Sequence, residues 1–155
     1  MKLRFVYLIS ALLIVAAVAV AQEMEKRGDR VMGFDHLKTT HHFLLRENGG
    51  AIVITANSVD DNESRDQIRM HLKHIAHMFA EGDFKAPMLI HDQVPPGVAT
   101  MQKLKSEISY DFAEVDRGAS VRMSTKNPEA LAAIHSFLRF QITEHKTGDP
   151  LEVSN

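Results

Sequence analysis

The 155-residue chain has no cysteine, only five prolines and eight glycines, and no large excess of charge of either sign. Without cysteine it can hold no disulfide scaffold, no thiolate metal site, no cysteine nucleophile and no acylated lipoprotein cysteine. The formal net charge of −2, with histidine counted as neutral, gives no electrostatic reason to expect nucleic acid as a partner. The motifs H-E-x-x-H, G-x-S-x-G, G-x-G-x-x-G and the P-loop are also missing.

Histidine and methionine stand out among the residues that are present. The chain contains nine histidines and eight methionines, while 45% of all residues are hydrophobic and 25% are charged. This length and composition fit one globular domain with enough aliphatic residues to bury a core. Imidazole and thioether groups are therefore the unusual chemistry of this sequence.

The N-terminus has the pattern of a secretory signal peptide. Lys2 and Arg4 precede an apolar run over residues 5–20, and Ala19-Val20-Ala21 supplies the small residues that a signal peptidase reads. We expect cleavage before Gln22, which leaves residues 22–155 as a single domain in the periplasm or outside the cell, without a stable membrane anchor. The alternative is a retained anchor, although about 16 apolar residues are fewer than the roughly 20 that span a bilayer.

The remaining chain predicts a unit of two strands and a helix. Residues 40–45 and 51–55 are β-branched or apolar runs on either side of Glu47-Asn48-Gly49-Gly50, and Asn-Gly is a strong hairpin signal. A helix follows, capped within residues 60–62 and ending at Gly82. Its apolar positions recur at helical spacing: Ile68, Leu72, Ile75 and Phe79.

A second unit repeats this order of elements. Strands over residues 109–115 and 119–124 flank Asp116-Arg117-Gly118, and Asn127-Pro128 caps a helix that runs to Gly148. An offset of 66 residues superposes the two helices, so that Ile68 aligns with Ile134 and Leu72 with Leu138. We infer an internal duplication, with repeats over about residues 39–84 and 108–149.

The segment between the repeats predicts three short elements. Pro87-Met88-Leu89-Ile90-His91 predicts a strand, Pro95-Pro96-Gly97 a turn, and residues 98–107 a short helix. Hairpins favour an antiparallel sheet, on which amphipathic helices bury their apolar stripes. The predicted fold is therefore α+β: duplicated β-β-α units form an antiparallel sheet with two long helices packed on one face. We expect the tail after Pro150 to be loosely attached.

Three residues of the first long helix form a candidate metal site. At about 100° per residue, His71, His74 and Met78 lie on one flank of the apolar stripe, whereas His77 lies opposite the core. Imidazole with thioether suits copper, and imidazole with carboxylate or water suits zinc or nickel. The alternative is a polar helix flank that contains histidine without any ligand.

The second long helix carries polar residues where the first is apolar. Gln141 and His145 lie on its inward line, at the positions that Ile75 and Phe79 occupy in the first helix. This exchange predicts an asymmetric polar site between the repeats, although His145 near a helix end could also be a half-exposed terminal residue.

The other candidate ligands lie on predicted strands. His41 and His42 are adjacent in a strand, so one of them faces the helices and the other faces away. His91 ends the run over residues 87–91. The candidate ligand-binding residues are therefore His145, Gln141, His41, His42 and His91.

Several strings form a recognisable set: Met32-Gly33-Phe34-Asp35, Thr39-Thr40-His41-His42-Phe43, Ile68-Arg69-Met70-His71-Leu72, Gly82-Asp83-Phe84, Pro95-Pro96-Gly97 and residues 137–149. They resemble a family of small exported bacterial proteins of unassigned function. The resemblance covers nearly the whole predicted mature chain and implies an exported domain. Some members carry the name aspartate carbamoyltransferase, but this chain lacks the Ser-Thr-Arg-Thr phosphate loop, so the resemblance implies no such activity here.

Two functions are compatible with these patterns. The first is an exported binding protein that holds a transition metal such as copper or zinc, a metal-containing ligand such as haem, or an organic ligand at a histidine-lined site. The second is a small periplasmic enzyme with His145, His41 or His91 as general base beside Asp83 or Glu144, with or without zinc. We favour binding because the sequence has no nucleophile motif. The ligand and the oligomeric state are left open.

Overall fold

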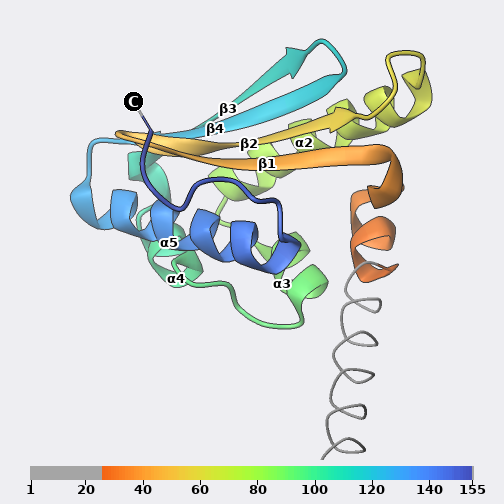
Figure 1. Ribbon diagram of the computed structural model, residues 1–155. Helices are drawn as coiled ribbons and strands as arrows, with labels where there is room; N and C mark the ends of the chain where they lie inside the picture. Colours follow the sequence, from red (N-terminus) through yellow and green to blue (C-terminus); the bar gives the residue numbers. More distant parts are fainter. Residues whose placement is uncertain (1–25, 155) are drawn as a thin grey trace, which may run out of the picture.

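The computed structural model describes residues 26–154 as a four-stranded antiparallel sheet with helices packed against one face (Figure 1). The predicted signal peptide, residues 1–21, lies outside the described residues. No helix within residues 26–154 combines the length and the apolar character needed to cross a bilayer. After a helix over residues 26–32, the elements are η1 (His36–Lys38), β1 (Thr39–Arg46), β2 (Gly49–Ala56), α2 (Asn62–Ala80), α3 (Lys85–His91), α4 (Val98–Lys103), η2 (Lys105–Glu107), β3 (Ile108–Val115), β4 (Gly118–Thr125) and α5 (Pro128–His145).

The sheet confirms the predicted α+β fold and places the two repeats side by side. Its strand order is β1-β2-β4-β3, and the repeats meet where β2 pairs with β4 around Ile52 and Val121. Each long helix then packs on the hairpin of the other repeat: α2 lies mainly on β4 and β3, and α5 lies on β1 and β2. A site between α5 and β1 is therefore a site between the repeats.

Local sequence signals begin the two long helices as predicted. The Asp61 side chain accepts a hydrogen bond from Ser64 N at 3.0 Å, which caps α2. The Asn127 side chain accepts from two backbone N–H groups at the start of α5, and Pro128 is the first residue of that helix. The aligned apolar residues of both helices are fully buried in one core: Ile68, Leu72, Ile134 and Leu138.

Equivalent hydrogen bonds in the two repeats support the duplication. The strands superpose at an offset of 69 residues and the helices at 66, because five residues join β2 to α2 but only two join β4 to α5. Arg69 of α2 corresponds to His135 of α5. Each of them bonds to two carbonyl groups that flank the turn of the facing hairpin, at 2.9–3.1 Å. The carbonyls are those of Val115 and Gly118 in one repeat and of Arg46 and Gly49 in the other, which also correspond.

The prediction of a strand over residues 87–91 is wrong, because these residues form the greater part of α3. Pro87 is the third residue of this helix, where a backbone N–H would have no intrahelical acceptor. A short apolar run fits a buried helix as well as a strand. His91 therefore reaches the core from the end of a helix, and it is buried.

The C-terminal tail is bonded to the edge strand β1, so the expectation of a loosely attached tail is also wrong. After Pro150, Ser154 N donates to Leu45 O at 3.2 Å and the Leu151 carbonyl accepts from Nε of Arg139 at 2.9 Å; directly before Pro150, Asp149 accepts from Phe43 N at 2.9 Å. Figure 1 shows the tail returning from the end of α5 along β1. The free backbone groups of an edge strand provide the partners on β1.

Candidate functional site

Four histidine rings gather where α5 faces β1. The ring of His145 lies 6.0 Å from that of His41 and 5.0 Å from that of His91, measured between centroids. Phe34 joins the fourth ring to this group, because its own ring lies 6.0 Å from His41 and 5.6 Å from His71. We call His41, His71, His91 and His145 the histidine cluster. Its members come from β1, α2, α3 and α5, so every layer of the fold contributes.

Gln141 fixes the orientation of His91. The Nε2 atom of His91 lies 3.0 Å from Oε1 of Gln141, so it carries the hydrogen and donates to the amide oxygen. The other ring nitrogen, Nδ1, is then a lone-pair acceptor; it is buried, has no hydrogen-bond partner and lies 4.0 Å from Oε2 of Glu144. The amide N–H₂ group of Gln141 is likewise buried and unpaired.

Burial keeps the histidine cluster uncharged at neutral pH. Loss of solvent, the largest cause, together with neighbouring histidines lowers the pKa of His41 and of His71 to about 4 and that of His145 to about 3. Burial also lowers the pKa of His91, against opposing contributions from Gln141 and Glu144. Neutral imidazole is the form that offers a lone pair to a ligand or a metal ion.

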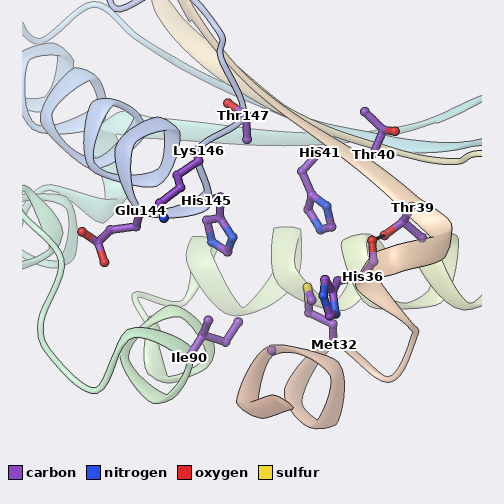
Figure 2. A pocket seen from close by; sticks show the side chains of 11 residues that line it. Met32, His36, Thr39, Thr40, His41, Ile90, Glu144, His145, Lys146 and Thr147 are labelled. Carbon is purple, nitrogen blue, oxygen red and sulfur yellow. Dashed lines mark hydrogen bonds between the residues drawn. The ribbon is translucent and has the colours of Figure 1, made fainter. Parts of the chain in front are cut away.

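Two hollows meet at these rings. The outer one, which we call the histidine pocket, has a volume of about 330 Å³, and Figure 2 shows its lining. A smaller apolar cavity of about 60 Å³ lies behind it, between the sheet and the long helices. His41, Ile90 and His145 line both hollows, so they separate the open pocket from the core.

Two histidines of the cluster end helices in the same unusual way. His91 is the last residue of α3 and His145 the last of α5. The next residues, Asp92 and Lys146, have left-handed backbones with φ of 53° and 51°, although neither is glycine. The sequence predicted that α5 runs to Gly148, but Lys146 ends it earlier. Such conformations cost free energy for residues other than glycine and are concentrated at functional sites.

The structure brings together four of the five predicted ligand-binding residues, namely His145, Gln141, His41 and His91. It also decides which strand histidine faces the helices: His41 does. His42 points away from the cluster, and its Nδ1 lies 2.8 Å from Oδ1 of Asp149 in the tail. His42 thus holds the tail and lies outside the pocket.

The predicted metal ligands of the first long helix have different surroundings. His71 packs edge-on against Phe34 and belongs to the histidine cluster. His74 is exposed, and Met78 is half-buried against the core. The structure therefore places only His71 of these three near the other buried imidazoles.

Sequence reasoning missed Met32, whose thioether lines the histidine pocket. Met32 ends the helix over residues 26–32, which no periodic pattern predicted. The only local signal is Gly33, whose left-handed backbone (φ 80°) follows directly and is typical of a helix end. Glu144, considered earlier only as a partner for a catalytic histidine, lies at the same pocket.

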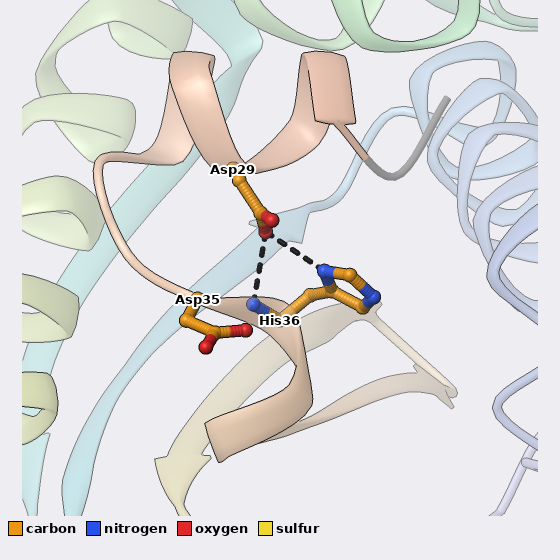
Figure 3. A group of neighbouring side chains, drawn as sticks. All are labelled: Asp29, Asp35 and His36. Atoms are coloured by element: carbon orange, nitrogen blue, oxygen red, sulfur yellow. Dashed lines mark hydrogen bonds and ion pairs between the residues drawn. The ribbon is translucent and has the colours of Figure 1, made fainter. Parts of the chain in front are cut away.

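A separate group of polar side chains lies near η1, as Figure 3 shows. Ligand atoms of Asp29, Asp35 and His36 all lie within 4.8 Å of one another. Asp29 Oδ1 accepts from both the backbone N and the ring Nδ1 of His36, each at 2.9 Å, and the Asp35 side chain caps η1 by accepting from Leu37 N. These bonds connect the helix over residues 26–32 to η1, which directly precedes β1, and this explains the group structurally.

The chain matches no family model, no curated protein and no solved structure in comparisons of all three kinds. The resemblance to small exported proteins therefore stays a prediction. Function has to be inferred from the chemistry of the histidine pocket itself.

Proposed function

We propose that this protein is an exported binding protein that takes up a small ligand, a metal ion or an organic molecule, in the histidine pocket. Buried polar atoms without a hydrogen-bond partner carry this proposal: Nε2 of His41, whose side chain lines the histidine pocket, with Nε2 of Gln141 at the smaller cavity behind it and Nδ1 of His91, whose ring lies 5.0 Å from that of His145. Each such atom costs roughly 1–3 kcal/mol while it is unpaired. A ligand that bonds to them recovers that free energy.

The protonation state of the cluster favours binding over general-base catalysis. A general base works best when its pKa is near the working pH. Burial lowers the pKa of His41 to about 4 and that of His145 to about 3, which makes both rings weak bases at neutral pH. The same burial preserves their lone pairs as ligands.

The export part of the proposal rests on the sequence of residues 1–21, with its cationic start, apolar run and small residues before Gln22. A periplasmic or external location also suits a binding protein. A protein there encounters metal ions and small molecules before they enter the cytoplasm. Mass spectrometry of the exported form should give an N-terminus at Gln22.

The binding proposal is tested on untagged protein, so that no added histidines compete. Protein from the wild type, from His145→Phe and from His77→Phe is compared by elemental analysis and native mass spectrometry. His145→Phe installs the residue that the first repeat has at this position, and His77 is an exposed histidine of α2 that serves as control. We expect a stoichiometric metal or bound mass in the wild type and in His77→Phe, and its loss in a folded His145→Phe. Equal amounts of bound metal or ligand in all three proteins would exclude the histidine pocket as the binding site.

A further inference from the structure

We propose that the histidine pocket binds one cuprous ion, Cu(I), through His41, His145 and Met32. This inference rests on the proposed binding function and names its ligand. The three side chains come from β1, α5 and the helix over residues 26–32, and all three line the same pocket.

The spacing of the two imidazole rings fits a shared metal ion. Two rings that bind one ion at about 2.0–2.1 Å from each nitrogen have centroids roughly 5–6.5 Å apart. The centroids of His41 and His145 are 6.0 Å apart, which meets this distance, while the rings are stacked in nearly parallel planes (5°), so at least one ring turns about its Cβ–Cγ bond when both bind one ion. Figure 2 shows the two rings side by side above the pocket. Nε2 of His41 is buried without a hydrogen-bond partner, so no protein hydrogen bond has to break when this nitrogen binds an ion.

A thioether faces these rings from the opposite wall. In Figure 2 the sulfur of Met32 lies across the pocket, below His41. The segment that carries it is docked, because Nε of Arg27 donates to the carbonyl of Ile90 at 3.2 Å and Met32 packs against the core. Thioether sulfur is a soft ligand that selects Cu(I), whereas zinc prefers imidazole, carboxylate and thiolate.

Charge and ligand number also favour Cu(I) over zinc. Bringing a charge into a largely apolar site is costly, and the cost is smaller for a monovalent ion than for a divalent one. Glu144 and Lys146 both line the pocket, so their opposite charges offset each other and the pocket does not repel a monovalent cation. Within residues 26–154, no three cluster histidines have ring nitrogens all within 4.8 Å of one another, so the tetrahedral set that zinc prefers is not assembled.

The test is an anaerobic titration of the untagged exported protein with Cu(I), in competition with the chelator bathocuproine disulfonate. The variants are Met32→Leu and His145→Phe, and Met70→Leu is the matched control because Met70 is an exposed methionine of α2. We expect one Cu(I) per wild-type chain, unchanged affinity in Met70→Leu, and losses of at least about tenfold in Met32→Leu and His145→Phe. Circular dichroism confirms that each variant is folded.

X-ray absorption identifies the ligands directly. The wild-type Cu(I) complex should show sulfur as well as nitrogen neighbours, and the sulfur contribution should disappear in Met32→Leu. Absence of Cu(I) binding, or equal binding by wild type, Met32→Leu and His145→Phe, would overturn the copper assignment. An organic mass that the wild type retains and His145→Phe loses would also overturn it, while leaving the proposed binding function in place.

Discussion

The two repeats place a pair of rings at the same position between helix and sheet, with different side chains and different ring orientations. In one half, Phe79 of α2 meets Tyr110 of β3 with ring centroids 5.9 Å apart. The offsets of 66 and 69 residues make His145 and His41 their counterparts, and these centroids are 6.0 Å apart. Rings thus occupy this position in both repeats, edge-on in one (73°) and parallel in the other (5°), and imidazole adds nitrogen lone pairs. The exchange of rings therefore changes the chemistry of this position from apolar to polar.

The surroundings explain why only one half opens into a pocket. Phe84 stacks on Phe79 at 4.3 Å, and Phe137 packs edge-on against both rings, so the Phe79–Tyr110 half is closed by aromatic side chains. The His145–His41 half is covered by α3 and by the helix over residues 26–32, neither of which belongs to a repeat. The unpaired polar atoms of the His145–His41 half lower the free energy of unfolding. Functional sites typically reduce stability in this way.

Acid should distinguish the two halves most strongly. In the folded, metal-free protein, burial lowers the pKa of His41 and His71 to about 4 and that of His145 to about 3, against 6.5 as the ordinary value. The folded state thus binds fewer protons, so stability is complete above about pH 6.5 and falls as the pH drops toward about 4. We expect the free energy of unfolding in urea to decrease by about 5 kcal/mol between about pH 7 and pH 5, or about 2 kcal/mol for each of the three histidines.

The variant His145→Phe makes that experiment specific, because it gives the second repeat the ring of the first. Its loss of stability over the same pH range should be clearly smaller. Carboxylates with lowered pKa, such as Asp149, lose their contribution only at more acidic pH. Identical pH profiles for the two proteins would contradict the view that His145 is buried and neutral.

A single methyl group should reveal a second difference between the halves. Gly50 of β2 corresponds to Ala119 of β4. A Cβ atom at Gly50 would lie 2.2 Å from Cδ1 of Leu138 and 2.5 Å from the carbonyl oxygen of Leu44, so α5 or the strand must move. We expect Gly50→Ala to destabilise the fold by about 2 kcal/mol in urea unfolding. The reverse change, Ala119→Gly, should cost only about 1 kcal/mol. Equal costs would mean that both helices approach the sheet equally closely.

Much of the fold could be predicted because its signals are local. Asn48-Gly49 and Asn127-Pro128 determine a turn and a helix start through backbone conformation and capping, and the structure has both where the sequence predicts them. The failures concern segments whose structure depends on distant partners. Residues 87–91 form a helix because they pack against the core, and the tail is ordered because β1 offers free edge groups.

The candidate site was predictable only in part, for the same reason. Gln141 and His145 stood out because helical periodicity placed polar groups where their counterparts are apolar. Periodicity gives no information on which other elements face that position. Met32 lies outside both repeats, and His71 turns toward Phe34 rather than toward His74, so neither assignment follows from spacing along a helix.

The paired turn contacts predict a smaller difference. Arg69 bonds to two carbonyls and pairs with Glu114 at 3.0 Å, whereas its counterpart His135 shares one ring N–H between two carbonyls. We expect Arg69→Ala to cost about 1.5 kcal/mol and His135→Ala about 1 kcal/mol in urea unfolding. Arg65→Ala, which removes an ion pair with Asp66 on the surface of the same helix, should change stability by at most about 0.5 kcal/mol. If His135→Ala cost more than Arg69→Ala, the turn contacts of the two repeats would not be equivalent.

The smallest effect is expected from removing one oxygen atom. The hydroxyl of Tyr110 is buried without a hydrogen-bond partner within the described residues, and burial raises its pKa, so it stays neutral. Tyr110→Phe should therefore leave stability unchanged or raise it by about 0.5 kcal/mol, because no hydrogen bond is lost and a buried polar group is removed. Its counterpart change, His41→Phe, should likewise preserve the fold but abolish ligand uptake, as elemental analysis and native mass spectrometry would detect. A loss of more than about 1 kcal/mol in Tyr110→Phe would show that the hydroxyl is bonded after all. The two halves would then differ in how their polar atoms are satisfied as well as in whether those atoms bind a ligand.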